Sequence, residues 1–364
     1  MSQIETKCIH EGWKPSQGEP RQLPIYQSTT FKYDTSDAMG ALFDLEASGY
    51  FYTRLQNPTN DAVAAKITAM EGGYAGMLTS SGQAANFYAV FNICECGDSF
   101  LASTAIYGGT YNLFGVTMKK MGIECIFFDQ DSTDEEIEAL IKPNTKCIFG
   151  ETVTNPTVTV FDIERFANLA HKHGMPLIID NTFATPVNCR PIEWGCDIVT
   201  HSTTKYMDGH AVCVGGAIVD SGNFDWEANA ERFPGLTTPD ESYHGLTYTK
   251  KFGKAAYITK ATSQLMRDFG SIQSRKMLST STSALRAFRF AWSATAATPL
   301  RLRSTSRATT RLHGFILQAS RTIRTTLSPK NTARTARAAS SPSASRAAVR
   351  LPSTSWTASS SSRS

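Results

Sequence analysis

The chain has 364 residues, of which 41% are hydrophobic and 19% are charged, and its formal net charge is +4 at pH 7. No apolar run is long enough to predict a membrane span, and the start, Met1 to Glu5, lacks the basic and apolar pattern of a signal peptide, so we expect a cytoplasmic protein. All eight cysteines lie at or before Cys213 without CxxC spacing, which favours reduced thiols over disulfides or a metal site.

The first candidate binding turn is Ser80 to Asn86, which follows a short apolar run and begins a helical pattern that extends to Ile93. Gly82 in this turn would let backbone N–H groups approach an anion, and the helix N-terminus adds a favourable partial charge. The simpler interpretation is a plain helix cap, because most Ser-Gly turns before helices have only that role.

Short apolar runs that predict buried strands alternate with helical patterns. The predicted strands are residues 97–101, 123–128 and 146–149. The predicted helices are 134–141, behind a capping box formed by Ser132 and Glu135, and 162–173, which Gly174 ends. Strands that alternate with helices predict an α/β fold with a mostly parallel sheet flanked by helices.

Tyr107 follows the apolar run 100–102, close to the predicted end of a strand, and precedes Gly108-Gly109-Thr110. An aromatic ring at this place can stack on a planar cofactor. The alternative is a tyrosine of the hydrophobic core, which is the commoner role.

Asp180 and Lys205 form the most informative pair. Asp180 ends the apolar run 177–180, and Lys205 lies just past the next apolar run, 25 positions further along the chain. Pyridoxal phosphate needs a lysine for its Schiff base and an acid that keeps its pyridine nitrogen protonated. Ser202 and Thr204 add hydroxyls for a phosphate group. The alternative is a surface lysine on a loop and an aspartate that caps a helix.

Six segments carry a family resemblance, and they cover roughly residues 5 to 274. They are Tyr52-Thr53-Arg54 with Asn57-Pro58-Thr59, Ser81-Gly82-Gln83-Ala84, Tyr107-Gly108-Gly109-Thr110, Glu151-Thr152 with Asn155-Pro156, Asp180-Asn181-Thr182-Phe183-Ala184-Thr185-Pro186, and Ser202-Thr203-Thr204-Lys205-Tyr206. With them the chain resembles the Cys/Met-metabolism family of pyridoxal-phosphate enzymes, which have the type I fold. Residues 223–226 and 239–246 resemble its O-acetylhomoserine sulfhydrylase branch.

The resemblance implies a role for each matching residue. Lys205 would form the Schiff base and move protons, Asp180 would pair with the pyridine nitrogen, and Tyr107 would stack on the ring and help to protonate the leaving group. The cofactor-binding set that it implies is Tyr52, Arg54, Gly82, Gln83, Tyr107, Asn155, Asp180, Thr182, Ser202, Thr204 and Lys205. Tyr52 and Arg54 would reach the phosphate of a neighbouring subunit, so each site would depend on a dimer, and two dimers would form a tetramer.

The implied reaction is a γ-replacement of methionine biosynthesis and transsulfuration. Sulfide or a thiol would replace the acetate of O-acetylhomoserine and give homocysteine or methionine. A methionine or cystathionine γ-lyase, or a cystathionine synthase, would use the same cofactor residues. A further alternative is a catalytically silent fragment that binds the cofactor.

Residues 275–364 differ from the rest of the chain. They contain 14 Arg, 2 Lys and no acidic residue, whereas residues 1–274 contain 20 basic and 32 acidic residues. This composition, rich in Ser, Thr and Ala, predicts a basic disordered tail. Such a tail would bind polyanions nonspecifically, but it lacks the aromatic interleaving of a specific nucleic-acid site.

We expect a frameshift near Ser274 and Arg275, because another reading frame of the same codons permits segments that resemble the family's C-terminal domain. That domain supplies the arginine for the substrate carboxylate in the family, and no residue of this chain can be assigned to that role. The expected domains are an N-terminal arm (1–60) that contacts a neighbouring subunit, a large cofactor-binding domain (61–255), the start of a C-terminal domain (256–274) and the tail (275–364).

Overall fold

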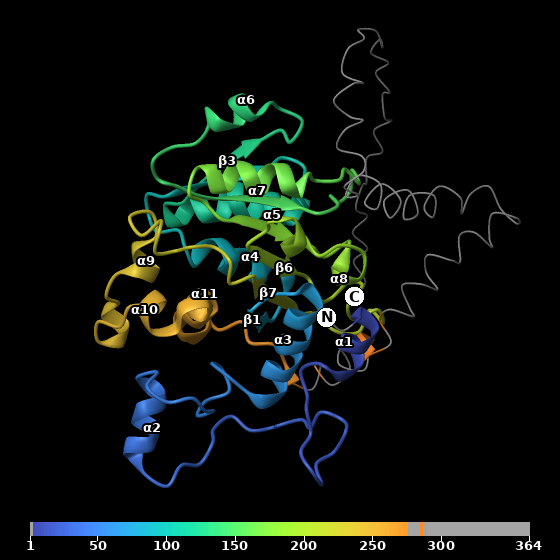
Figure 1. The fold of residues 1–364 in the computed structure, drawn as a ribbon, viewed down its shortest axis with the longest axis vertical. Coiled ribbons are helices and arrows are strands. Elements are labelled where there is room, and N and C mark those ends of the chain that lie inside the picture. Colours follow the sequence, from blue (N-terminus) through green and yellow to red (C-terminus); the bar gives the residue numbers. More distant parts are fainter. Residues whose placement is uncertain (1–2, 276–277, 279–283, 287, 289–364) are drawn as a thin grey trace, which may run out of the picture. The chain divides into compact units, whose positions relative to one another are not determined.

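The computed structural model describes residues 3–275, 278, 284–286 and 288. They form a seven-stranded sheet with the order β1-β7-β6-β5-β4-β2-β3 (Figure 1). The strands are β1 Ala75–Thr79, β2 Ser99–Ser103, β3 Glu124–Phe128, β4 Thr145–Glu151, β5 Leu177–Asp180, β6 Ile198–His201 and β7 Gly216–Asp220. Strands β2 to β6 pair in parallel, and β7 is antiparallel to both β1 and β6. The predicted mostly parallel α/β sheet is therefore confirmed.

One predicted buried strand is only partly buried. In β3 the side chain of Glu124 is exposed and only that of Phe128 is buried. The reason is its place at the edge of the sheet, where β3 has β2 as its one neighbour. The inner strands β2 and β4 are buried along their whole length, as apolar runs between two helical layers require.

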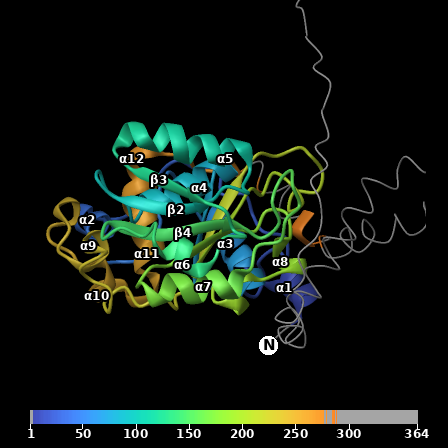
Figure 2. The ribbon, with the colours of Figure 1, turned by 90° about the horizontal axis from the view of Figure 1, so that it is seen from above.

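Helices cover both faces of the sheet. Figure 2 shows α5 and α7 on opposite sides of strands β2 and β4. The α-helices of this region are α3 Pro58–Glu71, α4 Gly82–Phe91, α5 Gly108–Asn112, α6 Asp134–Glu138, α7 Ile163–Lys172 and α8 Thr185–Asn188. A π-helix (Leu113–Thr117) and two 3₁₀ helices (Met118–Met121 and Pro191–Trp194) complete it.

The helices differ from their predicted limits in one instructive place. The run Ser132-Thr133-Asp134-Glu135-Glu136 allows two capping boxes, and the structure forms the second. The N–H of Glu136 donates to the hydroxyl of Thr133 (3.3 Å), and the N–H of Thr133 donates to the carboxylate of Glu136 (2.9 Å). The predicted box of Ser132 and Glu135 is therefore wrong by one residue, and α6 ends at Glu138, before the predicted Ile141.

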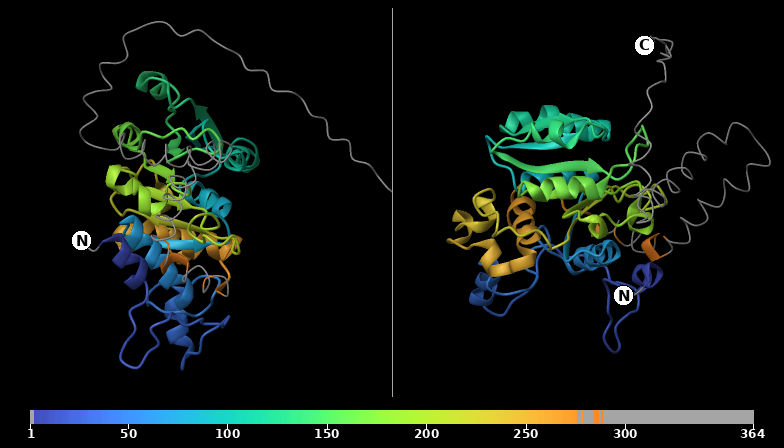
Figure 3. Two further views of the ribbon diagram at one scale, coloured as in Figure 1. Left: turned by 90° about the vertical axis from the view of Figure 1, so that its right-hand side faces the viewer. Right: turned by 45° about the horizontal axis from the view of Figure 1, so that its top comes forward.

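The first helix of the N-terminal segment lies beside α3, as the blue ribbons near the N label in Figure 3 show. The segment contains α1 (Ile4–His10) and α2 (Ser36–Phe43). The buried Lys66 of α3 donates to the carbonyl oxygen of Cys8 (2.8 Å), which ties α1 to the sheet domain. Asn57 caps α3 by accepting the N–H of Thr59 (3.0 Å), so the predicted boundary after residue 60 falls inside a helix.

Short helices follow β7 and pack against α4. They are α9 Pro234–Thr237, α10 Tyr248–Phe252, α11 Ala256–Lys260, α12 Arg267–Phe269, the π-helix Ala261–Met266 and the 3₁₀ helices Glu241–Tyr243 and Gly253–Ala255. The Tyr88 hydroxyl of α4 donates to the carbonyl oxygen of Gly270 (2.6 Å) in this layer. Within the described ranges no helix is long and apolar enough to cross a membrane.

The described part of the basic segment contributes to the core. The side chains of Leu278, Ala284, Leu285 and Phe288 are buried. The predicted tail otherwise lies outside the described residues, and its disorder and the frameshift at its start stay predictions.

Candidate functional site

A cavity of about 340 Å³ lies at the carboxyl ends of β4, β5 and β6. Its lining contains most of the residues that the sequence predicts for the cofactor site: Gly82, Gln83, Tyr107, Asn155, Asp180, Thr182, Ser202, Thr204 and Lys205. They come from five separate segments of the chain. The topology brings them together because the carboxyl ends of parallel strands meet at one edge of a sheet.

Asp180, the last residue of β5, is held on both carboxylate oxygens. Its Oδ1 accepts the N–H (3.0 Å) and the hydroxyl (2.5 Å) of Thr182, and its Oδ2 accepts Nδ2 of Asn86 (3.0 Å). The Thr182 hydroxyl oxygen also accepts the N–H of Ser202 (2.7 Å). The carboxylate therefore has a fixed orientation at the cavity wall, which excludes a simple helix-capping role for Asp180.

Asn86 is a site residue that the sequence analysis left without a role. The Thr200 hydroxyl donates to its Oδ1 (2.5 Å), which orients the amide so that Nδ2 points to Asp180 and to Thr110 Oγ1 (3.2 Å). The Thr110 hydroxyl in turn donates to Gln83 Oε1 (2.9 Å). A signal was present in the sequence, because Asn86 lies four positions after Gly82 on the same helix face.

Gly82 is required by a close approach of two backbones. A Cβ atom at this position would lie 2.5 Å from Cβ and 2.8 Å from Cα of Ser202. The N-terminus of α4 can thus approach the turn after β6, with Ser81 as the cap that accepts the N–H of Ala84 (3.2 Å). The first-turn N–H groups of Gly82 and Gln83 and the hydroxyl of Ser202 form a cradle that suits an anion.

Thr204 is less available than its position suggests. Its hydroxyl donates to the carbonyl oxygen of Gly215 (3.2 Å) and accepts the N–H of the same residue (3.1 Å). These two bonds join the turn that carries Lys205 to the start of β7. A phosphate would have to share this hydroxyl with Gly215.

Tyr107 is not a core residue. Its side chain is 48% exposed and its ring lines the cavity, so the alternative of a core tyrosine is wrong. Its backbone N–H donates to Oε1 of Glu151 (2.7 Å), the last residue of β4. Burial, and to a lesser degree the charge of Asp180, raises the pKa of the Glu151 carboxyl to about 8.

Lys205 lies in the turn after β6, is exposed, and lines the cavity. One cavity therefore holds an amine, a fixed carboxylate, an aromatic ring and an anion cradle. These are the groups that pyridoxal phosphate needs, and the residues present fit that cofactor.

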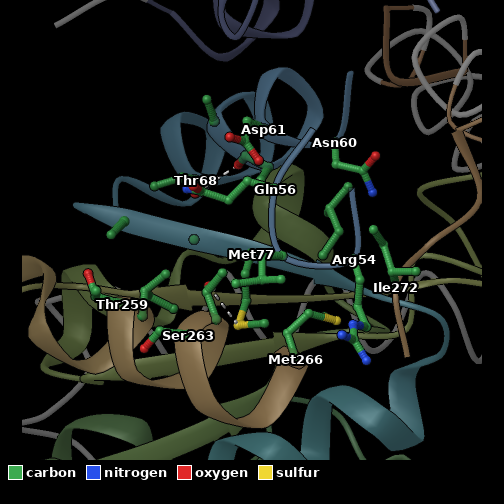
Figure 4. A pocket seen from close by; sticks show the side chains of 18 of the residues that line it. Arg54, Gln56, Asn60, Asp61, Thr68, Met77, Thr259, Ser263, Met266 and Ile272 are labelled. Atoms are coloured by element: carbon green, nitrogen blue, oxygen red, sulfur yellow. Dashed lines mark hydrogen bonds between the residues drawn. The ribbon is translucent and has the colours of Figure 1, made fainter. Parts of the chain in front are cut away.

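Tyr52 and Arg54 lie elsewhere. The Arg54 guanidinium carbon is 5.2 Å from the centre of the Tyr52 ring, and neither residue lines the Lys205 cavity. Arg54 lines a second cavity of about 500 Å³ beside α3 (Figure 4), with Asp61 and Thr68 from that helix and Met266 from the following layer. The structure thus does not bring the pair to the Lys205 site of its own chain. Their reach into a neighbouring subunit stays a prediction.

Six of the eight cysteines are buried, whereas Cys125 is half-buried and Cys96 is exposed. Cys94 and Cys196 are buried, and burial raises the pKa of both thiols, which makes them weak nucleophiles and weak metal ligands at neutral pH. In the part of the chain that the structure describes, no group of three or more His, Cys, Asp or Glu side chains could hold a metal ion.

Known proteins share this sequence pattern. Residues 5–286 match the family described as Cys/Met metabolism PLP-dependent enzyme. The chain is 43% identical over 276 residues to homocysteine/cysteine synthase of Kluyveromyces lactis. This match covers 75% of this chain and 62% of that protein. It is 42% identical over 272 residues to O-acetyl-L-homoserine sulfhydrylase of Corynebacterium glutamicum, over 74% of this chain and 62% of that protein. The chain therefore spans less than two thirds of the length of these relatives.

A solved structure shares the fold. It is a putative O-acetylhomoserine (thiol)-lyase from Campylobacter jejuni, with a TM-score of 0.79 and 32% identity, and the match covers 84% of this chain and 77% of that chain. That structure contains N'-pyridoxyl-lysine-5'-monophosphate. The predicted type I fold is confirmed.

Proposed function

The chain belongs to the Cys/Met metabolism family of pyridoxal-phosphate-dependent enzymes, and we propose that its reaction is a γ-replacement on O-acetylhomoserine. Sulfide or a thiol would displace acetate and give homocysteine or methionine. The observation that carries the proposal is the single cavity in which Lys205, Asp180 and the α4 anion cradle meet. The relatives named as homocysteine synthase and O-acetylhomoserine sulfhydrylase support the choice of reaction.

Each side chain has a separate task in this proposal. Lys205 would hold the cofactor through Nζ, and after the substrate amine takes its place Nζ would remove the Cα proton and, once it has given that proton up, a Cβ proton. Asp180 would hold the pyridine nitrogen through the carboxylate that Thr182 and Asn86 orient. When bound, the cofactor serves as an electron sink for the charge that develops on the substrate. Tyr107, at the open side of the cavity, would stack on the ring and protonate the leaving acetate.

The substrate half of the site is incomplete in the described residues. Lys205 is the one cation among the side chains that line the cavity, so none of the residues described there offers an arginine to the substrate carboxylate. We therefore expect the chain to bind the cofactor but to turn over substrate slowly or not at all. This observation favours the second candidate, a catalytically silent cofactor-binding protein.

A product assay separates the candidate reactions. Release of acetate that depends on added sulfide or thiol indicates γ-replacement, whereas formation of 2-oxobutanoate from the same substrate indicates a γ-lyase. Neither product, from protein that retains the cofactor, indicates the silent protein.

Cofactor binding itself is tested by trapping. We expect purified chain with added pyridoxal phosphate to develop the visible absorption of a lysine adduct, and borohydride followed by peptide mapping to place the label on Lys205. Soluble protein with no such band, or with the label on another lysine, would contradict the proposal.

Assembly and location belong to the same proposal. Tyr52 and Arg54 would complete the phosphate site of a neighbouring subunit, in a dimer or a tetramer of the chain. Residues 1–60 would be the arm that makes this contact, 61–255 the cofactor-binding domain and 256–274 the start of a second domain. The protein would act in the cytoplasm on small amino-acid and thiol substrates, without a specific nucleic-acid or membrane partner.

A further inference from the structure

Glu151 belongs to a matching motif but has no role in the proposed reaction. It ends β4, is buried, and lines the same cavity as Lys205. In the pairing of β4 with β5 its Cα partner is Asp180. Side chains of partner residues on parallel strands point to the same face of the sheet, so two carboxyl groups stand side by side at the carboxyl edge.

Both oxygens of Glu151 hold backbone of the cavity wall. Oε1 accepts the N–H of Tyr107 (2.7 Å), and Oε2 accepts the N–H of Asn155 (3.3 Å). The first bond fixes the segment after β2 that carries the stacking ring. The second fixes the segment after β4 that carries the Asn155 amide. One buried carboxyl thus sets the position of two cavity residues from different loops.

The charges around Glu151 are unbalanced. The charged side chains that line the cavity are Asp180 on β5 and Lys205 after β6, and the α4 side chains Gln83 and Asn86 are neutral. Burial, and after it the charge of Asp180, raises the pKa of Glu151. The two backbone N–H bonds lower this pKa but do not outweigh the first two effects, and the resulting pKa is about 8. Near pH 7 the carboxyl therefore carries a proton in the cofactor-free protein.

We propose that Glu151 is a positioning residue for Tyr107 and that it gives up its proton when the protonated ring nitrogen of the cofactor binds at Asp180. The cation neutralises the neighbouring carboxylate, and the negative form of Glu151 then becomes the favoured one. The proton goes to the solvent when the ring arrives protonated, or to the ring nitrogen when it arrives neutral. This inference rests on the proposed binding of the cofactor at Lys205.

The number of protons exchanged on cofactor binding tests the inference. We would titrate the full chain with pyridoxal phosphate by calorimetry at pH 7, in two buffers that differ in ionisation enthalpy. When pyridoxal phosphate binds with its ring protonated, the unaltered protein should release about one more proton than Glu151→Gln does. When the ring arrives neutral, the unaltered protein should take up about one proton fewer than Glu151→Gln does. The variant should also bind pyridoxal phosphate about tenfold more weakly, because one of the two backbone N–H bonds is lost.

Asp220→Asn is the matched control, because Asp220 is also a buried carboxyl with a raised pKa, about 7, but does not line this cavity. It should leave the proton count unchanged. Equal counts for the unaltered protein and Glu151→Gln would overturn the inference. Failure to label Lys205 in the unaltered protein would instead overturn the proposed function.

A second measurement covers the case in which Glu151→Gln does not fold. The infrared difference spectrum of the unaltered chain, recorded with and without pyridoxal phosphate, should lose the carbonyl band of a protonated carboxyl group on binding. No loss of that band would contradict the proposed proton release.

Discussion

At the scale of single residues, Gly82 offers the sharpest test of the anion cradle. Gly82→Ala would place a Cβ atom 2.5 Å from Cβ of Ser202, so the turn after β6 and the start of α4 would have to move apart. We expect pyridoxal phosphate to bind at least ~10-fold more weakly, equivalent to about 1.4 kcal/mol. A binding titration followed by absorption measures the change.

Gly108→Ala is the control for this experiment. Gly108 is also the first residue of a helix, α5, and a Cβ atom there would meet nothing within 4 Å. It should leave the affinity unchanged. Equal losses in the two variants would mean that the loss at Gly82 does not come from its close approach to Ser202.

The predictability of the site differs from residue to residue. Lys205 and Asp180 could be predicted because each follows an apolar run, and strand ends of a parallel sheet converge. Asn86 and Glu151 could not be given roles in the same way. Their functions depend on partners 94 and 44 positions away along the chain, Asp180 and Tyr107, and only the packed sheet brings these side chains within hydrogen-bond distance.

Asp220 makes stability depend on pH. Burial raises the pKa of its carboxyl from 3.8 to about 7, so between these values the folded chain holds a proton that the unfolded chain has lost. The contribution of Asp220 to the free energy of unfolding therefore falls as the pH rises through this window. Asp220→Asn removes the titration.

Urea unfolding at pH 5.5 and pH 7.5 measures the free energy of unfolding of both proteins. The free energy of unfolding of Asp220→Asn minus that of the unaltered protein should increase by about 2 kcal/mol from pH 5.5 to pH 7.5. A new amide that lacks a partner would lower stability equally at both pH values and would not change this difference. The same difference in free energy of unfolding at both pH values would show that Asp220 does not titrate within the window.

At the scale of elements, a buried cluster joins α3 to the strand ends that carry the site. His201 Nε2, at the end of β6, lies 2.6 Å from Oε1 of Glu71, the last residue of α3. The same oxygen accepts Nδ2 of Asn181 (2.8 Å), directly after Asp180. Thr152, after β4, donates its hydroxyl to Asn181 Oδ1 (2.8 Å). The ends of three neighbouring strands are therefore held by one carboxylate.

Glu71→Ala should lower the free energy of unfolding by about 3–5 kcal/mol, because it leaves His201 and Asn181 buried without their acceptor. Denaturant unfolding measures this loss, and cofactor affinity should fall with it. Lys32→Ala is the control. Lys32 pairs with Asp34 in solvent, with side chains 85% and 88% exposed, and its removal should have no measurable effect. A small change for Glu71→Ala would show that the cluster is not a structural tie.

The limits of sequence reasoning at this scale follow from topology. Alternating strands and helices predicted the parallel part of the sheet, because each crossover needs a helix. Neither the edge position of β3 nor the antiparallel β7 follows from the local pattern. Both depend on the order of strands across the sheet, which the sequence of an individual strand does not contain.

At the scale of the whole molecule, charge divides the chain into two unlike parts. Residues 1–274 have 20 basic and 32 acidic side chains, and residues 275–364 have 16 basic and none acidic. Of these 16, Arg275, Lys276 and Arg286 precede residue 289, and the other 13 lie at or after it. A version of the chain that ends after residue 288 keeps the buried Leu278, Leu285 and Phe288 and loses most of the basic charge.

We expect the full chain to bind duplex DNA of arbitrary sequence at low salt and the version that ends at residue 288 to bind far more weakly. The reason is the release of counterions by clustered arginines, since a net acidic domain repels the same polyanion. Fluorescence anisotropy at several salt concentrations measures it, and the logarithm of the affinity should fall steeply with the logarithm of the salt concentration. Cofactor labelling of Lys205 should be the same in both proteins, because the cavity residues all precede residue 216. Equal DNA binding would place the polyanion site on the sheet domain, and loss of labelling would show that the basic segment supports the cavity.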